Sequence, residues 1–221
     1  MVTNLKNKRV LITAGPTWVP IDSVRIISNT ATGETGILLA KKLSGLGARV
    51  TLLLGSAKKI SLGKKVRVVA FGSFDELATQ LRKSLKKQRY DILVHSAAVS
   101  DYRLKKCFLG RKLSSGLKEL RLTLKPTPKL INFLRDRCKN SYLVGFKFEP
   151  GAGKNRLISE ASRLIKKTGI NLTVANSVRN GRYTAYLVTS RSNLGPMHTK
   201  SSLADNLIRL IRSDYAKFEH R

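Results

Sequence analysis

The sequence predicts an α/β fold, with an open parallel sheet, helices on both faces and a small β flap or hairpin extension. Short apolar runs such as Arg9–Thr13 and Tyr90–His95 are typical of buried strands. Amphipathic segments lie between them, as in Phe74–Lys87, where leucine recurs every four residues. A turn rich in small residues leads from the first run into a helix. Strands alternating with helices favour βαβ units, and therefore a Rossmann-like sheet.

The remaining elements follow the same two patterns. We expect further buried strands at Ala48–Leu54, Val66–Ala70, Tyr142–Lys147 and Ile170–Ala175, and an alternating strand at Tyr183–Thr189. Amphipathic periodicity predicts further helices at Ile37–Leu43, Thr127–Cys138, Asn155–Lys167 and Ser202–Phe218.

The regular alternation stops after Asp101. Residues 102–116 are polar and irregular, and Leu117–Leu124 alternates apolar and polar residues as a half-exposed strand does. We interpret residues 104–124 as a flap on one domain spanning residues 1–221. A length of 221 residues suits a single domain, and no repeat or low-complexity linker divides the chain.

The charge is extreme, with 43 Lys and Arg against 13 Asp and Glu, a formal net charge of +30. Two interpretations compete. The protein binds nucleic acid by neutralising phosphates, or it is a basic protein whose pockets take polyanionic small molecules. The basic residues spread along the whole chain, without a basic tail or alternating aromatic residues. We therefore expect nucleic-acid affinity to be incidental to the charge.

Several classes of protein are disfavoured. No apolar run approaches the roughly 20 residues of a membrane span. The N-terminus lacks the apolar stretch of a secretory signal, so we expect a cytoplasmic protein. Cys107 and Cys138 form no disulfide or metal pattern, and His95, His198 and His220 are far apart. We therefore assign no metal ligand among the side chains.

The segment from Val10 to Gly36 predicts a strand that feeds an anion-binding loop. Gly33 and Gly36 flank the helix start, where free N–H groups and the helix dipole favour an anion. Close helix packing would explain the same glycines. Gly15 is followed by Pro16 and Thr17, which disfavours a G-x-G-x-x-G dinucleotide site. Residues 151–154 read GAGK but lack the other P-loop residues, so a surface turn is favoured there.

Three polar residues have two interpretations each. Asn29 is either a turn residue or a donor to a developing oxyanion. Asp101 and Lys112 are either a solvated pair or groups that hold a base edge and a phosphate. Composition does not choose between these alternatives.

Seven segments in order resemble the phosphopantothenate–cysteine ligase family, in a free-standing form without a flavin decarboxylase half. They are Val10–Thr17 (VLITAGPT), Pro20–Asn29 (PIDSVRIISN), Ser96–Arg103 (SAAVSDYR), Gly110–Ser115 (GRKLSS), Leu122–Ile131 (LTLKPTPKLI), Val144–Glu149 (VGFKFE) and Val174–Asn176 (VAN). The resemblance implies a ligase of coenzyme A biosynthesis that uses Mg²⁺ and CTP or ATP. The carboxylate of 4′-phosphopantothenate would attack the nucleotide α-phosphate, and cysteine would then displace the nucleotide from the acyl carbon. The family also implies a homodimer whose partner chain helps to build the site.

The resemblance implies catalytic roles for three residues. Asn29 would stabilise the oxyanion, Arg25 would help to place it or the pantothenoyl arm, and Lys112 on the flap would contact the triphosphate and act in catalysis. The phosphate loop would comprise Gly15, Thr17, Thr32 and Gly33.

The resemblance also implies a nucleotide site. Asp101 would accept from the cytosine amine, Ala97 and Ala98 would allow close approach to the backbone, and Phe146 would pack on the base or ribose. The helix start at Pro128, Lys129, Leu130 and Ile131 would face the nucleotide, and Arg163 and Lys167 would extend the phosphate contacts.

Some positions depart from the family pattern. Ala31 stands where a hydroxyl is common, Glu34 where a lysine is usual, and Ser177 where an aspartate is usual. Glu34 would put a negative charge near the phosphate loop. A basic nucleic-acid-binding protein on the same scaffold, without ligase activity, is the alternative. A short-chain dehydrogenase is disfavoured, because G-x-G-x-x-G and a Tyr-x-x-x-Lys pair are missing.

Overall fold

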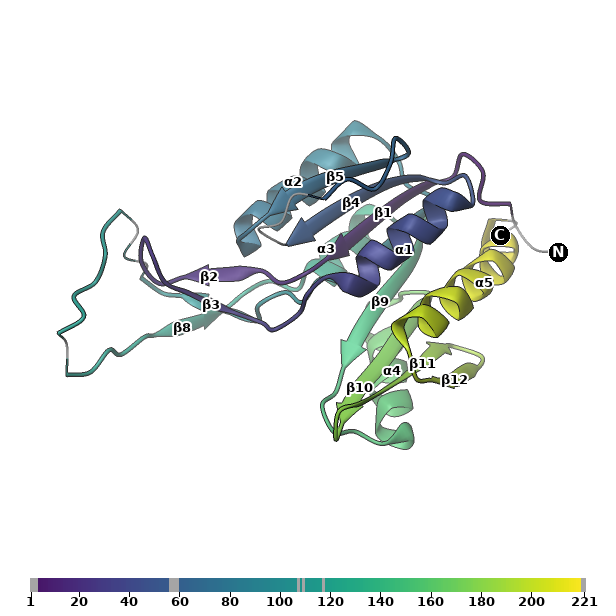
Figure 1. Cartoon of the computed structure of the whole chain (residues 1–221). Coiled ribbons are helices and arrows are strands. Elements are labelled where there is room, and N and C mark those ends of the chain that lie inside the picture. Colours follow the sequence, from purple (N-terminus) through teal and green to yellow (C-terminus); the bar gives the residue numbers. More distant parts are fainter. Residues whose placement is uncertain (1–3, 56–59, 107, 109, 117, 220–221) are drawn as a thin grey trace.

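The computed structural model describes residues 4–55, 60–106, 108, 110–116 and 118–219, so Cys107 and His220 lie outside the described residues. Its centre is an eight-stranded sheet with the order β12-β11-β10-β9-β6-β1-β4-β5 (Figure 1). The strands are β1 (Arg9–Ala14), β4 (Arg49–Gly55), β5 (Val66–Phe71), β6 (Ile92–His95), β9 (Tyr142–Phe148), β10 (Leu172–Arg179), β11 (Arg182–Thr189) and β12 (Asn193–Met197).

The strands from β5 to β10 in the sheet order run parallel to one another. β11 pairs antiparallel with β10, and β12 pairs antiparallel with β11. The predicted open α/β sheet is confirmed, with these two antiparallel strands closing one edge. β1 pairs with β4 on one side and with β6 on the other. The strand order therefore reverses beside β1, and ligands bind at such a reversal, beyond the carboxyl ends of the strands.

Helices cover both faces of the sheet. On one face, α1 (Glu34–Gly45) and α5 (Lys200–Glu219) pack on strand residues such as Val10, Ile12 and Leu52. On the other face lie α2 (Phe74–Lys87), α3 (Leu130–Arg137) and α4 (Lys154–Thr168). Successive residues of a strand point alternately to the two helical layers. Because both faces of the sheet are buried, the strand sequences are continuous apolar runs.

Local signals explain where the helices begin and end. Ser73 caps α2 by accepting a hydrogen bond from the Glu76 N–H, and basic residues occupy the last turn of this helix. The predicted helix Thr127–Cys138 is shorter in the structure, where α3 begins at Leu130. Pro128 disfavours the helical conformation for Thr127, and Lys129, the N-cap residue, is extended with φ −80° and ψ 110°.

A β-rich arm extends from the body (Figure 1). It contains two antiparallel pairs: β2 (Trp18–Pro20) with β3 (Ile26–Ser28), and β7 (Tyr102–Leu104) with β8 (Leu124–Pro126). Val19, Ile21 and Leu104 form a small buried core there. This arm includes the predicted flap, but the β2–β3 pair was not predicted.

The predicted strand Leu117–Leu124 is wrong in most of its length. Leu117 lies outside the described residues, and residues 118–123 form no strand. β7 is only three residues long, and beyond the Leu104–Leu124 pair the ladder continues with a single hydrogen bond, from the Lys105 N–H to the Thr123 carbonyl oxygen at 2.9 Å. Leu122 instead packs on the arm core, and Leu120 is exposed.

Candidate functional site

A large cleft of about 1080 Å³ opens at the carboxyl ends of the parallel strands. Its lining comes from the loop before α1, the segment after β6, the start of α3, the end of β9 and one side of α4. Residues of the β10–β11 pair and Lys200 complete it. The cleft occupies the position that the strand order predicts.

Two glycines shape the floor of the cleft. Gly15 has a φ of +80°, and a Cβ there would lie 2.2 Å from the carbonyl oxygen of Gly55. Gly36 lies on α1, where a Cβ would meet the Cβ of Ala14 at 2.3 Å. Both positions therefore require glycine, the first for the turn and the second for close packing of helix on strand.

The N-terminus of α1 faces the cleft. Its cap residue, Gly33, has a φ of +77° and provides no side-chain cap, so the N–H groups of the first turn can receive an anion. The Glu34 carboxylate at this position forms an ion pair with Lys200 of α5. The negative charge introduced by Glu34 is therefore balanced within the cleft.

Asn29 joins the loop before α1 to the segment after β6. Its side-chain Nδ2 donates to the carbonyl oxygen of Ala98 at 2.9 Å. An amide nitrogen carries two N–H donors, and this bond uses one. The second N–H remains for a ligand, in an orientation that the first bond restricts.

His95 lines the cleft at the end of β6. Its Nδ1 lies 2.8 Å from the Oγ1 of Thr13. Desolvation by burial lowers the pKa of His95 to about 4, so its ring is neutral at neutral pH. Sequence reasoning treated this residue as an unremarkable histidine, although its position directly before Ser96 and Ala97 was the available signal.

Asp101 and Lys129 lie together at the start of α3. Lys129 Nζ is 2.5 Å from Asp101 Oδ1, and both residues line the cleft. The α3 N-terminus has no side-chain cap and no acidic residue in its first turn. Thr127 ties this segment to the strand ends, because its hydroxyl donates to the carbonyl oxygen of Ser100 at 2.6 Å.

The opposite wall combines aromatic and basic side chains. Phe146 and Phe148 of β9 and Tyr183 of β11 supply aromatic surface, and Phe148 is 52% exposed. Arg163 and Lys167 of α4 also line the cleft. The cleft then holds five basic residues (Lys129, Lys147, Arg163, Lys167 and Lys200) against three acidic residues (Glu34, Asp101 and Glu160), an excess of two positive charges.

Most predicted site residues meet in this cleft. Those that line it are Gly15, Asn29, Thr32, Gly33, Ala97, Ala98, Asp101, Pro128, Lys129, Leu130, Ile131, Phe146, Arg163 and Lys167. Sequence reasoning missed His95, Lys200, Phe148 and Tyr183. Lys200 and Tyr183 lie outside the segments to which the sequence assigned a site role, so only the fold brings them to the cleft.

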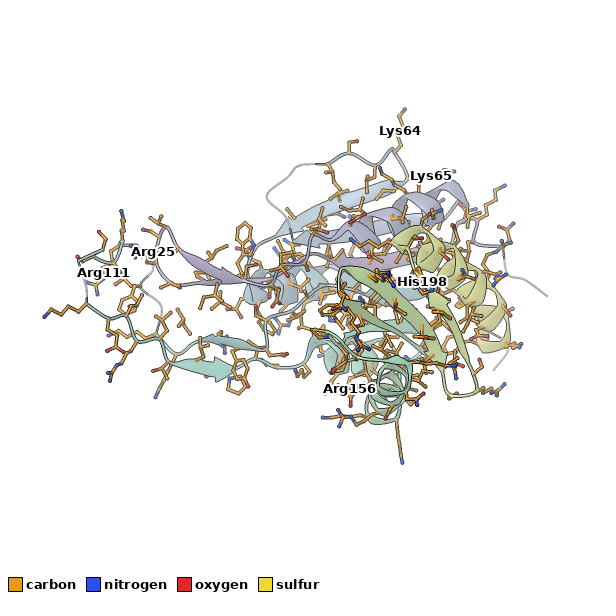
Figure 2. All side chains as sticks on the ribbon, turned by 60° about the horizontal axis from the view of Figure 1, so that its bottom comes forward. Arg25, Lys64, Lys65, Arg111, Arg156 and His198 are labelled. Carbon is orange, nitrogen blue, oxygen red and sulfur yellow. The ribbon has the colours of Figure 1, made fainter. Side chains whose placement is uncertain are left out.

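Three predicted residues are placed elsewhere. Thr17 is fully buried, and its Oγ1 accepts from the Ser100 N–H at 2.8 Å, so its hydroxyl is not available to a phosphate. Arg25 and Lys112 belong to the arm and do not line the cleft of their own chain. Figure 2 shows Arg25 near the far end of the arm.

A buried carboxylate holds the arm together. Asp22 is 3% exposed and accepts from the backbone N–H groups of Leu113, Val24 and Arg25. It also pairs with the Arg25 guanidinium at 2.9 Å. These interactions lower the pKa of Asp22 to about 2, and the hydrogen bond from the Leu113 N–H contributes most to the decrease. Asp22 therefore brings the segment containing Lys112 against the turn containing Arg25.

Among the described residues there is no group of three or more His, Cys, Asp or Glu side chains that could hold a metal ion. The three cleft carboxylates each face a lysine or arginine partner instead.

Among the residues that the structure describes, no helix has the length and apolar character that a membrane span requires.

The fold and cleft define a class of Rossmann-like α/β protein with a glycine-containing loop and an uncapped helix N-terminus at the strand ends. The chain belongs to the family described as the DNA/pantothenate metabolism flavoprotein C-terminal domain, which it matches over residues 5–215. This match confirms the family predicted from the seven ordered segments.

Individual relatives agree with this assignment. The coenzyme A biosynthesis bifunctional protein CoaBC of Thermococcus kodakarensis is 36% identical over 176 residues, covering 80% of this chain and 43% of that protein. CoaBC of Borreliella burgdorferi is 28% identical over 212 residues, covering 94% of this chain and 53% of that protein. The chain therefore spans about half the length of these curated relatives. The structure titled DNA/pantothenate metabolism flavoprotein from Streptococcus pneumoniae matches with a TM-score of 0.82 and 25% identity, covering 94% of this chain and 99% of that chain.

Proposed function

We propose that this protein joins 4′-phosphopantothenate to cysteine through an acyl-nucleotide intermediate, with CTP or ATP as the activating nucleotide. The observation that carries the proposal is the Asn29 amide, fixed to Ala98 at the edge of a basic cleft. Family membership and the similarity to proteins named for coenzyme A biosynthesis support the same reaction.

The cleft suits a reaction between anions. A carboxylate must approach a triphosphate, so charge repulsion and positioning contribute much of the barrier. The uncapped starts of α1 and α3 offer N–H groups to phosphates, and Lys167, which forms no ion pair in the described part of the chain, adds positive charge. The second Asn29 N–H is the donor that we assign to the developing oxyanion. Phe146 offers an aromatic surface to the base or ribose.

Magnesium fits this proposal as a companion of the nucleotide. Mg²⁺ keeps several waters and is often bound through substrate phosphates and few carboxylates. The described cleft carboxylates are separated and paired with basic groups, which fits arrival of the ion on the triphosphate. It would neutralise phosphate charge there, while Lys167 and the N–H groups at the starts of α1 and α3 would hold the remaining charge.

We further propose that two copies of the chain complete the active site. Arg25 and Lys112 lie on the arm, outside the cleft of their own chain. The arm also exposes apolar side chains, among them Ile26 (46% exposed), Tyr102 (55%) and Leu124 (44%). Pairing of two arms would cover this surface and would bring Arg25 and Lys112 to a partner's cleft.

One assay tests the reaction and the choice of nucleotide together. Purified protein is incubated with 4′-phosphopantothenate, cysteine, Mg²⁺ and either CTP or ATP, and pyrophosphate release is measured. We expect release with at least one nucleotide, and phosphopantothenoylcysteine only when cysteine is present. Absence of pyrophosphate with both nucleotides would reject the ligase.

The charge of +30 motivates a second candidate, a nucleic-acid-binding protein on the same fold. This candidate requires submicromolar RNA or DNA binding at physiological salt, with a steep decrease as salt rises. Binding that vanishes at moderate salt would leave only non-specific attraction. The outcome is independent of the pyrophosphate assay.

A further inference from the structure

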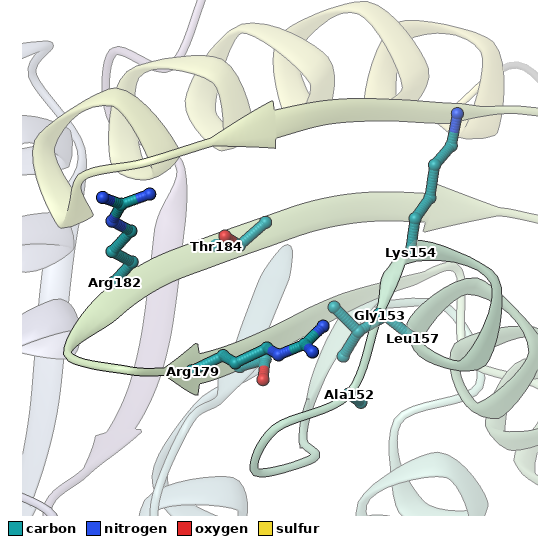
Figure 3. Close-up of a pocket in the computed structure, with 8 residues that line it drawn as sticks. Ala152, Gly153, Lys154, Leu157, Arg179, Arg182 and Thr184 are labelled. Atoms are coloured by element: carbon teal, nitrogen blue, oxygen red, sulfur yellow. The ribbon is translucent and has the colours of Figure 1, made fainter.

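A second, smaller cavity of about 190 Å³ lies beside the start of α4 (Figure 3). It is lined by Ala152, Gly153, Lys154, Leu157, Ser177, Arg179, Arg182 and Thr184. None of these residues lines the large cleft. The lining residues come from the N-terminus of α4 and from the end of the β10–β11 pair.

The strand register concentrates positive charge at this cavity. Arg179 of β10 lies directly opposite Arg182 of β11, and the next pair on the same face is Ser177 with Thr184. Like charges directly opposite each other in an antiparallel pair are destabilising. In the described part of the chain, neither arginine forms an ion pair, and the lining contains no acidic residue. An anion between the strands and the helix would relieve this repulsion.

The helix contributes backbone donors to the same cavity. Gly153 is the N-cap of the 15-residue helix α4, and no side chain caps its free N–H groups. The first turn contains no acidic residue. Glu149 precedes the helix, but its carboxylate is held by Lys147 at 2.9 Å and Arg156 at 3.2 Å, and it does not line the cavity. The helix dipole is therefore not offset by a carboxylate in this lining.

The Ser177 side chain supplies an independent sign of a missing ligand. This residue is 1% exposed and lines the cavity, yet its Oγ has no hydrogen-bond partner in the described structure. Buried hydroxyls without a partner are uncommon, because losing water without a replacement bond is unfavourable. A bound anion would accept a hydrogen bond from this hydroxyl.

We propose that this cavity is a binding site for a phosphate-class anion, separate from the large cleft. The Arg179 guanidinium, which points toward the start of α4 (Figure 3), the first N–H groups of α4 and the Ser177 hydroxyl are its donors, and Arg182 and Lys154 add positive charge to the lining. A tetrahedral dianion presents acceptors in several directions, which suits donors that come from both a helix start and a strand pair. The small volume favours free phosphate or pyrophosphate over a complete nucleotide.

The test is a titration of the ¹⁵N-labelled full chain with inorganic phosphate, at ionic strength held constant with chloride and followed by two-dimensional NMR. We expect saturable shifts of the Gly153, Lys154 and Asn155 amides. Pyrophosphate and CTP titrations distinguish the source of the phosphate group. If only CTP shifts these amides, the site binds the phosphates of a nucleotide, and the proposal that it binds free phosphate or pyrophosphate is overturned.

Matched variants assign the binding to the cavity. Arg179→Gln and Arg182→Gln should each raise the apparent Kd for phosphate about tenfold. Ser177→Asp should abolish saturable binding, because it adds a carboxylate at the centre of the site. Arg67→Gln removes the same charge from β5, at the opposite edge of the sheet, and should change Kd less than about twofold.

Two results would overturn the proposal. The first is an absence of saturable amide shifts around Gly153 in the wild-type chain. The second is an equal increase of the phosphate Kd in Arg67→Gln and Arg179→Gln, which would show that only the net charge of the protein matters. The two arginine variants keep the test valid if Ser177→Asp fails to fold. Neither readout requires ligase turnover, so this proposal and the proposed function fail separately.

Discussion

Asn29 and Ala98 are 69 residues apart in sequence, and a hydrogen bond of 2.9 Å joins the Asn29 side-chain Nδ2 to the Ala98 carbonyl oxygen. The bond connects the loop before α1 to the segment after β6, two walls of the cleft. It restricts the amide orientation while leaving one N–H donor free. A pre-positioned donor of this kind stabilises a transition state without reorganisation during the reaction.

Asn29→Asp is therefore the first variant to measure. It keeps the size of the side chain but removes the N–H donors, so we expect turnover to fall about 100-fold or more. Asn140→Ala, an exposed amide outside the cleft, is the control and should retain wild-type turnover. Circular dichroism checks folding of both variants. Wild-type turnover in Asn29→Asp would remove this residue from the proposed chemistry.

Lys200 should matter because it neutralises Glu34 beside the phosphate loop. We expect Lys200→Gln to raise the nucleotide KM by about threefold to tenfold, since the pair is partly exposed. Adding Glu34→Gln should recover most of the loss, because the unpaired carboxylate is then absent. Independent effects in this double-mutant cycle would show that the two residues do not act together.

Asp22→Asn should loosen the arm without unfolding the body. The pKa of Asp22 is held at about 2, below the ordinary 3.8, so its ionised form is favoured in the native state. Its contribution is therefore complete above about pH 4 and is lost as pH falls toward 2. We expect faster hydrogen exchange of the Leu113 amide in the variant at neutral pH. Asp75→Asn, which affects an exposed pair with Arg103, should leave that rate unchanged.

His95 should titrate far below an ordinary histidine. Burial lowers its pKa from 6.5 to about 4, which favours the neutral ring in the folded state. The corresponding stability is complete above about pH 6.5 and is lost as pH falls from 6.5 to 4. An NMR titration should place the midpoint near 4, and His95→Gln should flatten the pH dependence of unfolding in that range. A midpoint near 6.5 would contradict the burial argument.

Gly36→Ala should destabilise the fold by about 1–3 kcal/mol, because the added methyl group meets Ala14 at 2.3 Å. Gly45→Ala lies on the same helix with nothing within 4 Å of the new Cβ, and should be neutral or slightly stabilising. Urea unfolding measures both. The double variant Gly36→Ala with Ala14→Gly should recover part of the loss if this contact is responsible.

The sequence predicted every strand of the sheet except β12, the five helices and most of the cleft, because these depend on local periodicity and on strand ends. Phe146 lies near the end of one apolar run and Asp101 lies in the segment that follows another, so their meeting was predictable from a parallel sheet. Lys200 was not, because its approach to Glu34 depends on how α5 packs beside α1. The β2–β3 pair was missed because three-residue strands carry too little alternation to be recognised.

The alternation of side chains along β10 constrains how this chain can vary. Asn176 and Val178 face the large cleft, whereas Ser177 and Arg179 face the small cavity. Inserting or deleting one residue within this strand would shift the register and exchange the two sets of side chains. Evolution at this strand is therefore limited to substitutions, and each site can diversify at its own alternate positions without altering the other.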